Sequence, residues 1–404
     1  MAMVDLKADI VVIGAGVAGL WLHRRLNDLG YYAILLDRAG LGGGQTLSSQ
    51  GIIHGGSKYT LSGMMTASAS AISAMPDRWQ RCMDAEGEID LSGLRVLSAN
   101  QFMWSTSALS SKLTSFFGSK VINGNIQQLS PEHYPLAFQS DQFNGNLYRL
   151  NEAVVDVPSL VERLSGKWRR RMLQLPQDYE FERNAQGLVA GIKVADQLQI
   201  SASQFVLSSG EGNQSLLAKL SMDTPKMQRR PVHMILAKGK SLPPIYAHCI
   251  GASAKPLVTI TTHYHSDGDP VWYIGGKLAE EAVDTGADDL IAEAETTLSR
   301  LLPWVDMNDV NWATHKINRA EPAQSNLLRP DTAFVKSVNN VHVAWPTKLA
   351  LTPDLVDRFE INLTEQHIQP DAGLNHKQID QAMPAEFAAT QAENLWEKLF
   401  HGVR

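Results

Sequence analysis

The segment from residue 9 to residue 37 constrains this chain most, because three glycines follow an apolar strand at the spacing of a dinucleotide-binding turn. A predicted strand, residues 10–13, runs into Gly14, Gly16 and Gly19 and then into a predicted helix, residues 20–29. In such a turn the first glycine permits a tight bend, the second lets the backbone approach a pyrophosphate, and the third lets helix and strand pack closely. The helix N-terminus adds unpaired N–H groups and the positive end of its dipole. The segment therefore predicts a dinucleotide phosphate site.

Asp37 strengthens this interpretation. A second apolar strand, predicted over residues 32–36, ends at this aspartate. A carboxylate at this place can accept hydrogen bonds from the diol of a ribose. A glycine-rich turn in an ordinary α/β unit would not explain Asp37. Which dinucleotide binds is left open by these residues alone.

Composition excludes several classes of function. The chain has 404 residues, a net charge of −6 and only two cysteines, Cys82 and Cys249. The charge gives no support for a nucleic-acid partner, and two cysteines exclude a disulfide framework. No apolar run is long enough for a transmembrane helix. We expect a cytoplasmic protein with peripheral membrane contact left open, because the basic run at residues 168–171 is more typical of a solvated helix face.

The order of predicted elements indicates an α/β protein with two interleaved domains. Residues 1–76, 150–225 and 325–404 are predicted to form one discontinuous domain, and residues 77–149 and 226–324 a second. Two helices are expected in the first domain, over residues 57–75 (ended by Met75-Pro76) and 156–171. Its later strands are expected over residues 179–183, 187–194, 197–200 and 204–210, the first three forming a meander. The second domain is expected to carry a hairpin turn at residues 266–269. The tail is expected to be helical and to pack on the outside.

Two further segments resemble a known family. Ser48-Ser49 continues through Ile53-His54-Gly55-Gly56 to Tyr59, and Pro346-Thr347-Lys348-Leu349 lies near the end. With the glycine turn, they resemble FAD-dependent oxidoreductases of the D-amino-acid oxidase class. Within that class the motifs are most similar to the glycerol-3-phosphate dehydrogenase branch and the related 2-hydroxyglutarate oxidases. Two positions depart from that branch: Arg319 is followed by Ala320 where the family has proline, and Pro353 replaces an arginine.

The resemblance implies a Rossmann-like FAD-binding domain of the glutathione-reductase type, with a parallel sheet and a β-meander. It also implies an interleaved α+β substrate domain built on a mostly antiparallel sheet. FAD is expected to bind non-covalently. The residues expected to contact it, from pyrophosphate and ribose to the isoalloxazine and adenosine ends, are Gly14, Gly16, Gly19, Asp37, Arg38, Thr46, Ser48, Ser49, Gln50, Gly51, Ser209, Gly210, Lys348 and Leu349.

The implied reaction is hydride transfer from a C–OH or C–N bond of a small, anionic substrate to flavin N5, with His54, Arg319 and Lys348 as the catalytic candidates. The electron acceptor is oxygen, a quinone or an electron-transfer protein. His263 and His265 are further candidates for a base, and Lys277 and Lys58 for anion binding. The two strand histidines share a face, but no third ligand is evident, so no metal is predicted.

Alternative functions remain. A flavin monooxygenase would carry a late Gly-Asp motif, which the strand expected at residues 341–346 lacks. An NAD-dependent dehydrogenase would not need the meander. A catalytically silent flavoprotein that serves as a binding module is supported only by the altered arginine positions.

Overall fold

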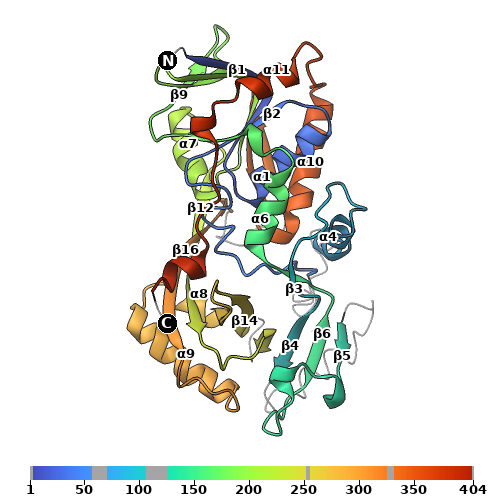
Figure 1. Ribbon diagram of the computed structural model, residues 1–404, viewed down its shortest axis with the longest axis vertical. Coiled ribbons are helices and arrows are strands. Elements are labelled where there is room, and N and C mark those ends of the chain that lie inside the picture. The colour runs from blue at the N-terminus through green and yellow to red at the C-terminus, as the bar shows by residue number, and fades with distance from the viewer. Residues whose placement is uncertain (1–2, 57–70, 106–125, 252–254, 325–331, 403–404) are drawn as a thin grey trace.

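The computed structural model describes residues 3–56, 71–105, 126–251, 255–324 and 332–402, and its strands fall into two large sheets at opposite ends of an elongated molecule (Figure 1). The first sheet has eight strands, six of them in the order β17-β18-β11-β1-β2-β8. Their bounds are Phe334–Val338, Val341–Trp345, Leu198–Leu207, Val4–Ile13, Ala33–Asp37 and Met172–Gln174. The pairs from β18 to β8 are parallel, and β17 pairs antiparallel with β18.

Strand β1 lies in the middle of this sheet and is buried on both faces. Ile10 and Val12 pack toward one side, where α1 (Val17–Asp28), α6 (Val157–Gly166) and α10 (Thr352–Glu365) cover the sheet. Val11 and Ile13 pack toward the other side, where α7 (Asn213–Lys219) lies. Such a continuous apolar run is typical of a parallel strand covered on both faces. The meander strands β9 (Glu180–Arg183) and β10 (Val189–Val194) lead into β11.

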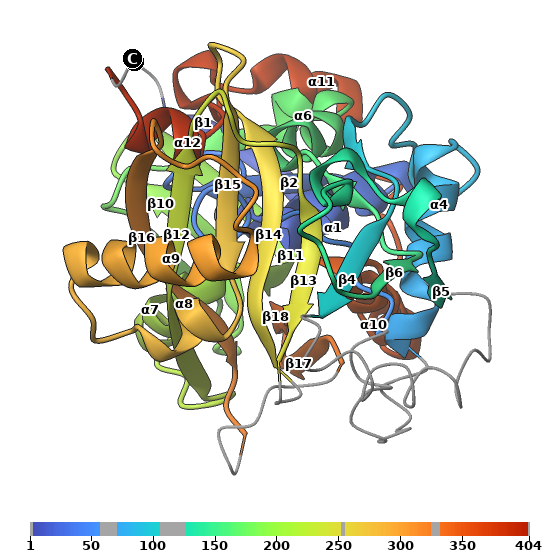
Figure 2. The ribbon, with the colours of Figure 1, turned by 90° about the horizontal axis from the view of Figure 1, so that it is seen from below.

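The second sheet also has eight strands, in the order β16-β12-β15-β14-β13-β4-β6-β5. Figure 2 shows its long strands side by side, with α9 (Ala287–Leu301) lying across them. All neighbouring pairs are antiparallel except β13 with β4. The bounds in sheet order are Asn311–Pro322, Met227–Lys238, Pro270–Gly275, Pro256–Tyr264, Tyr246–Ile250, Gln101–Ser105, Leu147–Leu150 and Ile126–Gln128.

The remaining elements are short. Strands β3 (Val96–Ser98) and β7 (Val154–Val155) form a separate antiparallel pair. The other α-helices are α4 (Met75–Met83), α8 (Lys277–Glu281), α11 (His376–Ala382) and α12 (Leu395–Leu399). The α/β class, the parallel sheet with its meander and the mostly antiparallel second sheet are thus as predicted, and so is the β14–β15 turn at residues 266–269. The predicted domain boundaries stay a prediction.

Several predicted elements differ from the structure. Residues 71–73 are helical and this helix ends before Met75-Pro76, as expected, but the same two residues also begin α4, because proline is compatible with a first helical turn. Residues 57–70 of that predicted helix lie outside the described residues. The two strands expected at residues 197–200 and 204–210 form the single strand β11. Helix α1 begins at Val17, earlier than expected, because Gly16 already serves as its N-cap.

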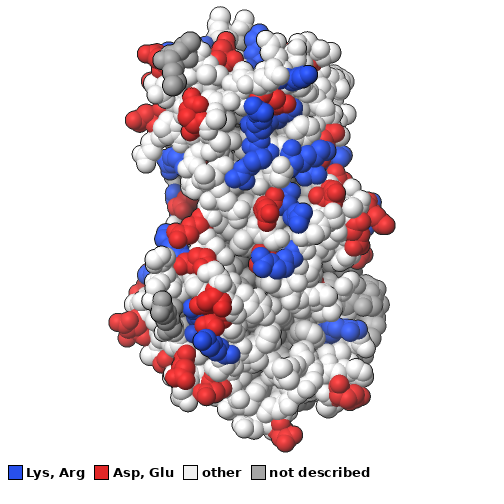
Figure 3. Space-filling model, viewed as in Figure 1, with Lys and Arg blue, Asp and Glu red and all other residues white. Residues whose placement is uncertain are grey.

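The basic run at residues 168–171 does not form the solvated helix face that was predicted. Helix α6 ends at Gly166, and Arg169–Arg171 is a 3-10 turn. Arg171 is buried, where its guanidinium pairs with Asp380 and stacks over the Tyr32 ring. Lys167 and Arg170 are exposed in this region, and Figure 3 shows basic side chains gathered here among acidic ones.

The tail does not lie only on the outside. Trp396 of α12 is 1% exposed and packs in the core of the second sheet, with its ring 4.2 Å from the ring of His263. Upstream, Ala388 and Gln391 form bridges with Leu173 and Leu41 of the first domain. The end of the chain therefore runs from the first sheet to the second. Among the described residues, none of the helices is both long enough and apolar enough to cross a bilayer.

Three buried histidines make the stability of the protein depend on pH. Burial lowers the pKa of His342 to about 4 and the pKa values of His23 and His263 to about 3. The unfolded chain, with histidine pKa values of about 6.5, binds these protons first. We therefore expect the free energy of unfolding to be constant above about pH 7 and to fall as the pH drops from about 6.5 to about 4.

The variant His342→Gln isolates one of these contributions. Its free energy of unfolding in urea should fall less steeply over that pH range, by up to about 3 kcal/mol, because one group no longer takes up a proton on unfolding. Equal slopes in the two proteins would show that His342 is not held neutral.

Candidate cofactor and active site

Backbone atoms pack closely against two glycines of the turn after β1. Gly14 has a φ of +110°, and a Cβ there would lie 2.5 Å from the backbone of Ser209, which follows β11. A Cβ on Gly19 would overlap the carbonyl oxygen of Gly14. The predicted roles of these two glycines, a tight bend and close packing of helix on strand, therefore match the geometry. This cradle fits a phosphate group that must come close to main-chain N–H groups.

Two side chains hold the turn in shape. The backbone N–H of Val17 donates to Oγ1 of Thr46 at 2.9 Å, and that of Ala15 donates to Oδ2 of Asp37 at 2.7 Å. The other Asp37 oxygen accepts from the N–H of Ala39 at 2.6 Å. Burial raises the pKa of the Asp37 carboxyl, and these backbone hydrogen bonds act against that rise. Asp37 thus has a structural role in the turn that the sequence analysis did not foresee.

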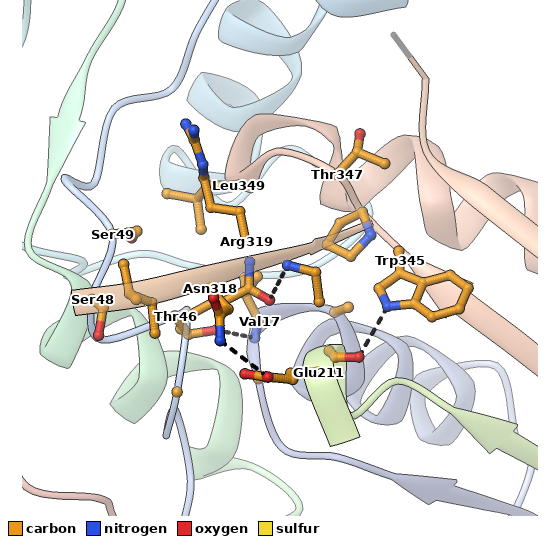
Figure 4. A pocket seen from close by; sticks show the side chains of 18 of the residues that line it. Val17, Thr46, Ser48, Ser49, Glu211, Asn318, Arg319, Trp345, Thr347 and Leu349 are labelled. Carbon is orange, nitrogen blue, oxygen red and sulfur yellow. Dashed lines mark hydrogen bonds between the residues drawn. The ribbon is translucent and has the colours of Figure 1, made fainter. Parts of the chain in front are cut away.

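A cavity of about 1180 Å³ extends from the glycine turn to strands β12 and β16 of the second sheet (Figure 4). Of the residues predicted to contact FAD, only Gly19 is absent from its wall, because it packs beneath the turn. The structure therefore brings the following predicted residues to one cavity: Gly14, Gly16, Asp37, Arg38, Thr46, Ser48, Ser49, Gln50, Gly51, His54, Ser209, Gly210, Arg319, Lys348 and Leu349. The volume exceeds the range of about 300–1000 Å³ typical of small-ligand pockets, as a dinucleotide plus a substrate requires.

The loop at residues 46–51 connects the two sheets across this cavity. The side-chain amide of Gln50 donates to the carbonyl oxygens of Thr259 and Tyr273, at 3.1 and 2.9 Å. The hydroxyl of Tyr273 donates to the carbonyl of Ser48 at 2.9 Å. The hydroxyl of Ser48 also lies 3.1 Å from Nε2 of His315 on β16. These contacts hold the loop, and with it the cavity wall, against the second sheet.

Charged groups gather at the end of the cavity formed by the second sheet. Both terminal nitrogens of Arg319 lie 3.2 Å from Oε1 of Glu280, and Nζ of Lys255 lies 2.7 Å from Oε2 of the same residue. Burial tends to raise the pKa of the Glu280 carboxyl, but the hydrogen bonds and charges of Lys255 and Arg319 lower it overall. Sequence analysis missed Glu280 and Lys255, because neither belongs to a recognisable motif. Lys277 also lines the cavity and pairs with Glu281 at 3.5 Å.

His54 lies in a cluster that the sequence did not reveal. Its Nδ1 is 3.1 Å from a carboxylate oxygen of Glu152, and its ring stacks at 6.2 Å on that of His248. The nitrogen and oxygen atoms of these three residues lie within 4.8 Å of one another, close enough to hold a metal ion. Glu152 and His248 are distant in sequence from His54, so no spacing signal could have found them.

Two of the predicted base candidates do not reach the cavity wall. His263 is buried beneath Trp396 and contacts the Thr261 hydroxyl at 3.0 Å. His265 lies at the β14–β15 turn, where it contacts carboxylates of Asp267 and Glu397. Lys58 lies outside the described residues.

A parallel sheet with a glycine turn and a meander, joined through one large cavity to a mostly antiparallel sheet, defines the class of dinucleotide-dependent proteins. The family model described as "FAD dependent oxidoreductase", DAO, matches residues 9–330. The chain is 46% identical over 398 residues to the probable FAD-dependent oxidoreductase PA4991 of Pseudomonas aeruginosa, covering 98% of this chain and 99% of that protein. This chain therefore belongs to the DAO family of FAD-dependent oxidoreductases, and FAD is its cofactor.

Solved structures agree with this fold. The crystal structure of PA4991 from Pseudomonas aeruginosa matches with a TM-score of 0.84, at 42% identity over 98% of both chains. Iminodiacetate oxidase from Chelativorans matches at 0.64, with 14% identity over 95% of this chain and 100% of that chain. L-α-glycerophosphate oxidase from Mycoplasma pneumoniae, with FAD bound, matches at 0.61, with 11% identity over 92% and 98%. At such low identity the last two show the fold alone.

The comparisons support the family but not the narrower resemblance. The 46%-identical relative has only a general oxidoreductase name, and nothing singles out the glycerol-3-phosphate dehydrogenase and 2-hydroxyglutarate oxidase branch. The motif around His54 is therefore informative about the family and not about the substrate.

The variant Gly19→Ala tests the cradle. We expect a loss of about 1–3 kcal/mol in the free energy of unfolding, because the new methyl group must displace the Gly14 carbonyl. The affinity for FAD should also fall by about tenfold or more, as measured by fluorescence titration of the apoprotein. The matched control is Gly166→Ala at the end of α6, where a Cβ would meet no atom within 4 Å and should change neither quantity by more than about 1 kcal/mol. If both variants bound FAD equally well, the turn would not be the phosphate cradle.

Proposed function

We propose that this enzyme oxidises a C–OH or C–N bond of a small anionic substrate by transferring a hydride to N5 of non-covalently bound FAD. The two sheets are proposed to mark a cofactor domain and a substrate domain with the boundaries expected from the sequence, apart from α12, which packs with the second sheet. Bound FAD supplies the hydride acceptor. The residues of this chain bind the substrate, orient it and exclude water.

The observation that carries this proposal is the position of Arg319. Its guanidinium is on β16 and lines the same cavity as the glycine turn, so a ligand held by it would face a cofactor held by the turn. Its Nε also donates to the backbone carbonyl of Arg230 at 3.3 Å, which fixes the direction of the side chain. A planar guanidinium held in this way is suited to a carboxylate or another oxyanion.

Lys348 and Leu349 support the placement of the flavin ring. They line the cavity immediately before the turn that leads into α10, a helix of fourteen residues. The preceding residue, Thr347, has a φ of +61°, which is unusual for a β-branched residue. Strain of this kind persists where the surrounding structure holds the backbone for a purpose. The positive end of a helix here would stabilise negative charge on a reduced flavin.

The variant Arg319→Met tests the role in substrate binding. The purified enzyme is mixed anaerobically with hydroxy acids, polyol phosphates and amino acids, and bleaching of the flavin absorbance identifies a substrate. For that substrate we expect the apparent Kd in Arg319→Met to rise about 30-fold, because a charge-assisted hydrogen bond is worth about 2 kcal/mol. The limiting rate of reduction should change far less.

The control is Arg300→Met, since Arg300 is exposed on α9 and does not line the cavity. It should leave both the affinity and the rate unchanged. If no compound in the panel bleaches the flavin, or if Arg319→Met binds the substrate as tightly as the control, this function is wrong. Yellow colour in an acid-precipitated pellet would contradict non-covalent binding.

A further inference from the structure

The cluster around His54 is built by pairing of distant chain segments. The loop after Gln50 runs antiparallel to the β7 segment, with the N–H of Ile53 bonded to the carbonyl of Ala153 at 2.8 Å and that of Val155 to Gly51 at 2.9 Å. This short ladder places His54 beside Glu152, in the turn between β6 and β7. His248 comes from β13 in the second sheet. The contact between His54 and Glu152 is therefore positioned by main-chain hydrogen bonds.

The protonation of His54 follows from its partner. An ionised carboxylate can only accept hydrogen bonds, so beside an ionised Glu152 the Nδ1 atom at 3.1 Å carries the hydrogen. The neutral ring then has its lone pair on Nε2. Glu152 thus selects the tautomer that can take up a proton on its far side. The same carboxylate stabilises the ring once that proton has been taken up.

Burial shows which side of the cluster is open. The side chain of Glu152 is 1% exposed and that of His54 is 25% exposed. His54 lines the cavity, whereas Glu152 and His248 do not. The one member of the cluster that a substrate can touch is therefore the imidazole, with the carboxylate behind it.

His248 is fixed as firmly as Glu152. Its Nδ1 lies 2.8 Å from the hydroxyl of Thr259, the residue directly opposite on β14, and its side chain is fully buried. Its ring lies nearly parallel to that of His54, with 22° between the planes. The His54 ring is thus oriented both by stacking and by its bond to Glu152.

We propose that Glu152 is a positioning residue that makes His54 the acceptor of a hydroxyl proton, and that the substrate is therefore a hydroxy acid or another hydroxy anion. The inference rests on the proposed function of the same cavity. The O–H proton passes to Nε2 of His54 while the C–H hydrogen leaves as a hydride to the oxidised flavin. The carbon is oxidised to a carbonyl, and the flavin is reduced by two electrons.

The chemistry distinguishes alcohols from amines at this point. A neutral amine has a nitrogen lone pair that can form the C=N bond as the hydride leaves, without prior loss of an N–H proton. An alcohol must lose its hydroxyl proton for the carbonyl to form, and a positioned base is worth about 10²- to 10⁴-fold in rate. A buried carboxylate held behind a cavity-facing histidine is needed for the oxidation of an alcohol, whereas the hydride transfer from a neutral amine does not need it.

The test uses the FAD-loaded enzyme and matched pairs of compounds that differ only in a hydroxyl or an amino group, such as lactate and alanine. Flavin reduction is followed anaerobically for the wild type, for Glu152→Gln and for the control Glu360→Gln, whose carboxylate pairs with Arg25 away from the cavity. We expect hydroxy compounds to reduce the flavin. In Glu152→Gln the limiting rate should be about 10- to 100-fold lower with an unchanged substrate Kd, and the control should behave as the wild type.

A spectroscopic measurement reports on the positioning itself. In ¹⁵N-histidine NMR spectra of the FAD-loaded enzyme without substrate, His54 should show the Nδ1–H tautomer in the wild type and in Glu360→Gln. In Glu152→Gln it should show a changed tautomer distribution. If Glu152→Gln does not fold, the partly exposed His54→Gln replaces it, with an expected loss of about 10²- to 10⁴-fold in the rate with hydroxy compounds.

The outcomes separate this inference from the proposed function. Two results together would show that the inference is wrong: amino compounds reduce the flavin, and Glu152→Gln (or His54→Gln in its place) reacts like the control. The proposed oxidoreductase function would then still stand. If no compound of either kind reduces the flavin, both are wrong. Stoichiometric Zn²⁺ in the purified enzyme, lost in Glu152→Gln, would also overturn the inference, because the three side chains would then be metal ligands.

Discussion

Close packing at the end of β1 is the constraint on which the rest of the structure depends. The backbone of Ser209, after β11, lies so close to Gly14 that there is no room for a Cβ on this glycine, and α1 begins three residues later at Val17. Two hydroxyls, those of Ser208 and Ser209, donate to carbonyls at the end of β1. Because these segments pack so closely here, the backbone of the turn is fixed, and several of its N–H groups are bonded within the protein, that of Gly14 to the Leu36 carbonyl and that of Ala15 to Asp37. The long cavity begins at this turn.

The second sheet is held to this cradle by a loop and by the ends of two of its own strands. Gln50 and Ser48 contact carbonyl and hydroxyl groups at β14 and β15, and Ala320 of β16 and Met227 of β12 pack with an apolar cluster of the first sheet. The Gln50 amide in this loop is paired with two backbone carbonyls, which avoids the cost of leaving it unsatisfied, whereas the buried Ser49 hydroxyl has no hydrogen-bond partner among the described residues. The cavity between the two sheets has the glycine turn on one wall and charged side chains on the other. This arrangement supports the proposed separation of cofactor binding from substrate binding.

The parts of the structure that could be predicted are those encoded locally. The glycine spacing, the buried strands and the hairpin at residues 266–269 depend on contacts between near neighbours, and each lies where the sequence indicated. The residues that were missed depend on pairing over long distances. Glu152 reaches His54 through the ladder between residues 51–53 and 153–155, and Glu280 reaches Arg319 from a separate helix. Trp396 joins the second sheet because its ring fits over His263, which no periodicity in a polar tail reveals.

The same long-range pairing sets what the substrate end of the cavity can accept. Arg319 and Lys255 hold opposite oxygens of Glu280, so each of these charges has an internal partner before any ligand arrives. Taking such charges out of water is costly unless they are paired and hydrogen-bonded, and the pairing also fixes the guanidinium in place. A ligand must therefore offer Arg319 a better partner than Glu280 does, or share the guanidinium with it. If Arg319 binds the substrate as proposed, a carboxylate that approaches in the plane of the guanidinium can compete with Glu280, because it forms two parallel hydrogen bonds.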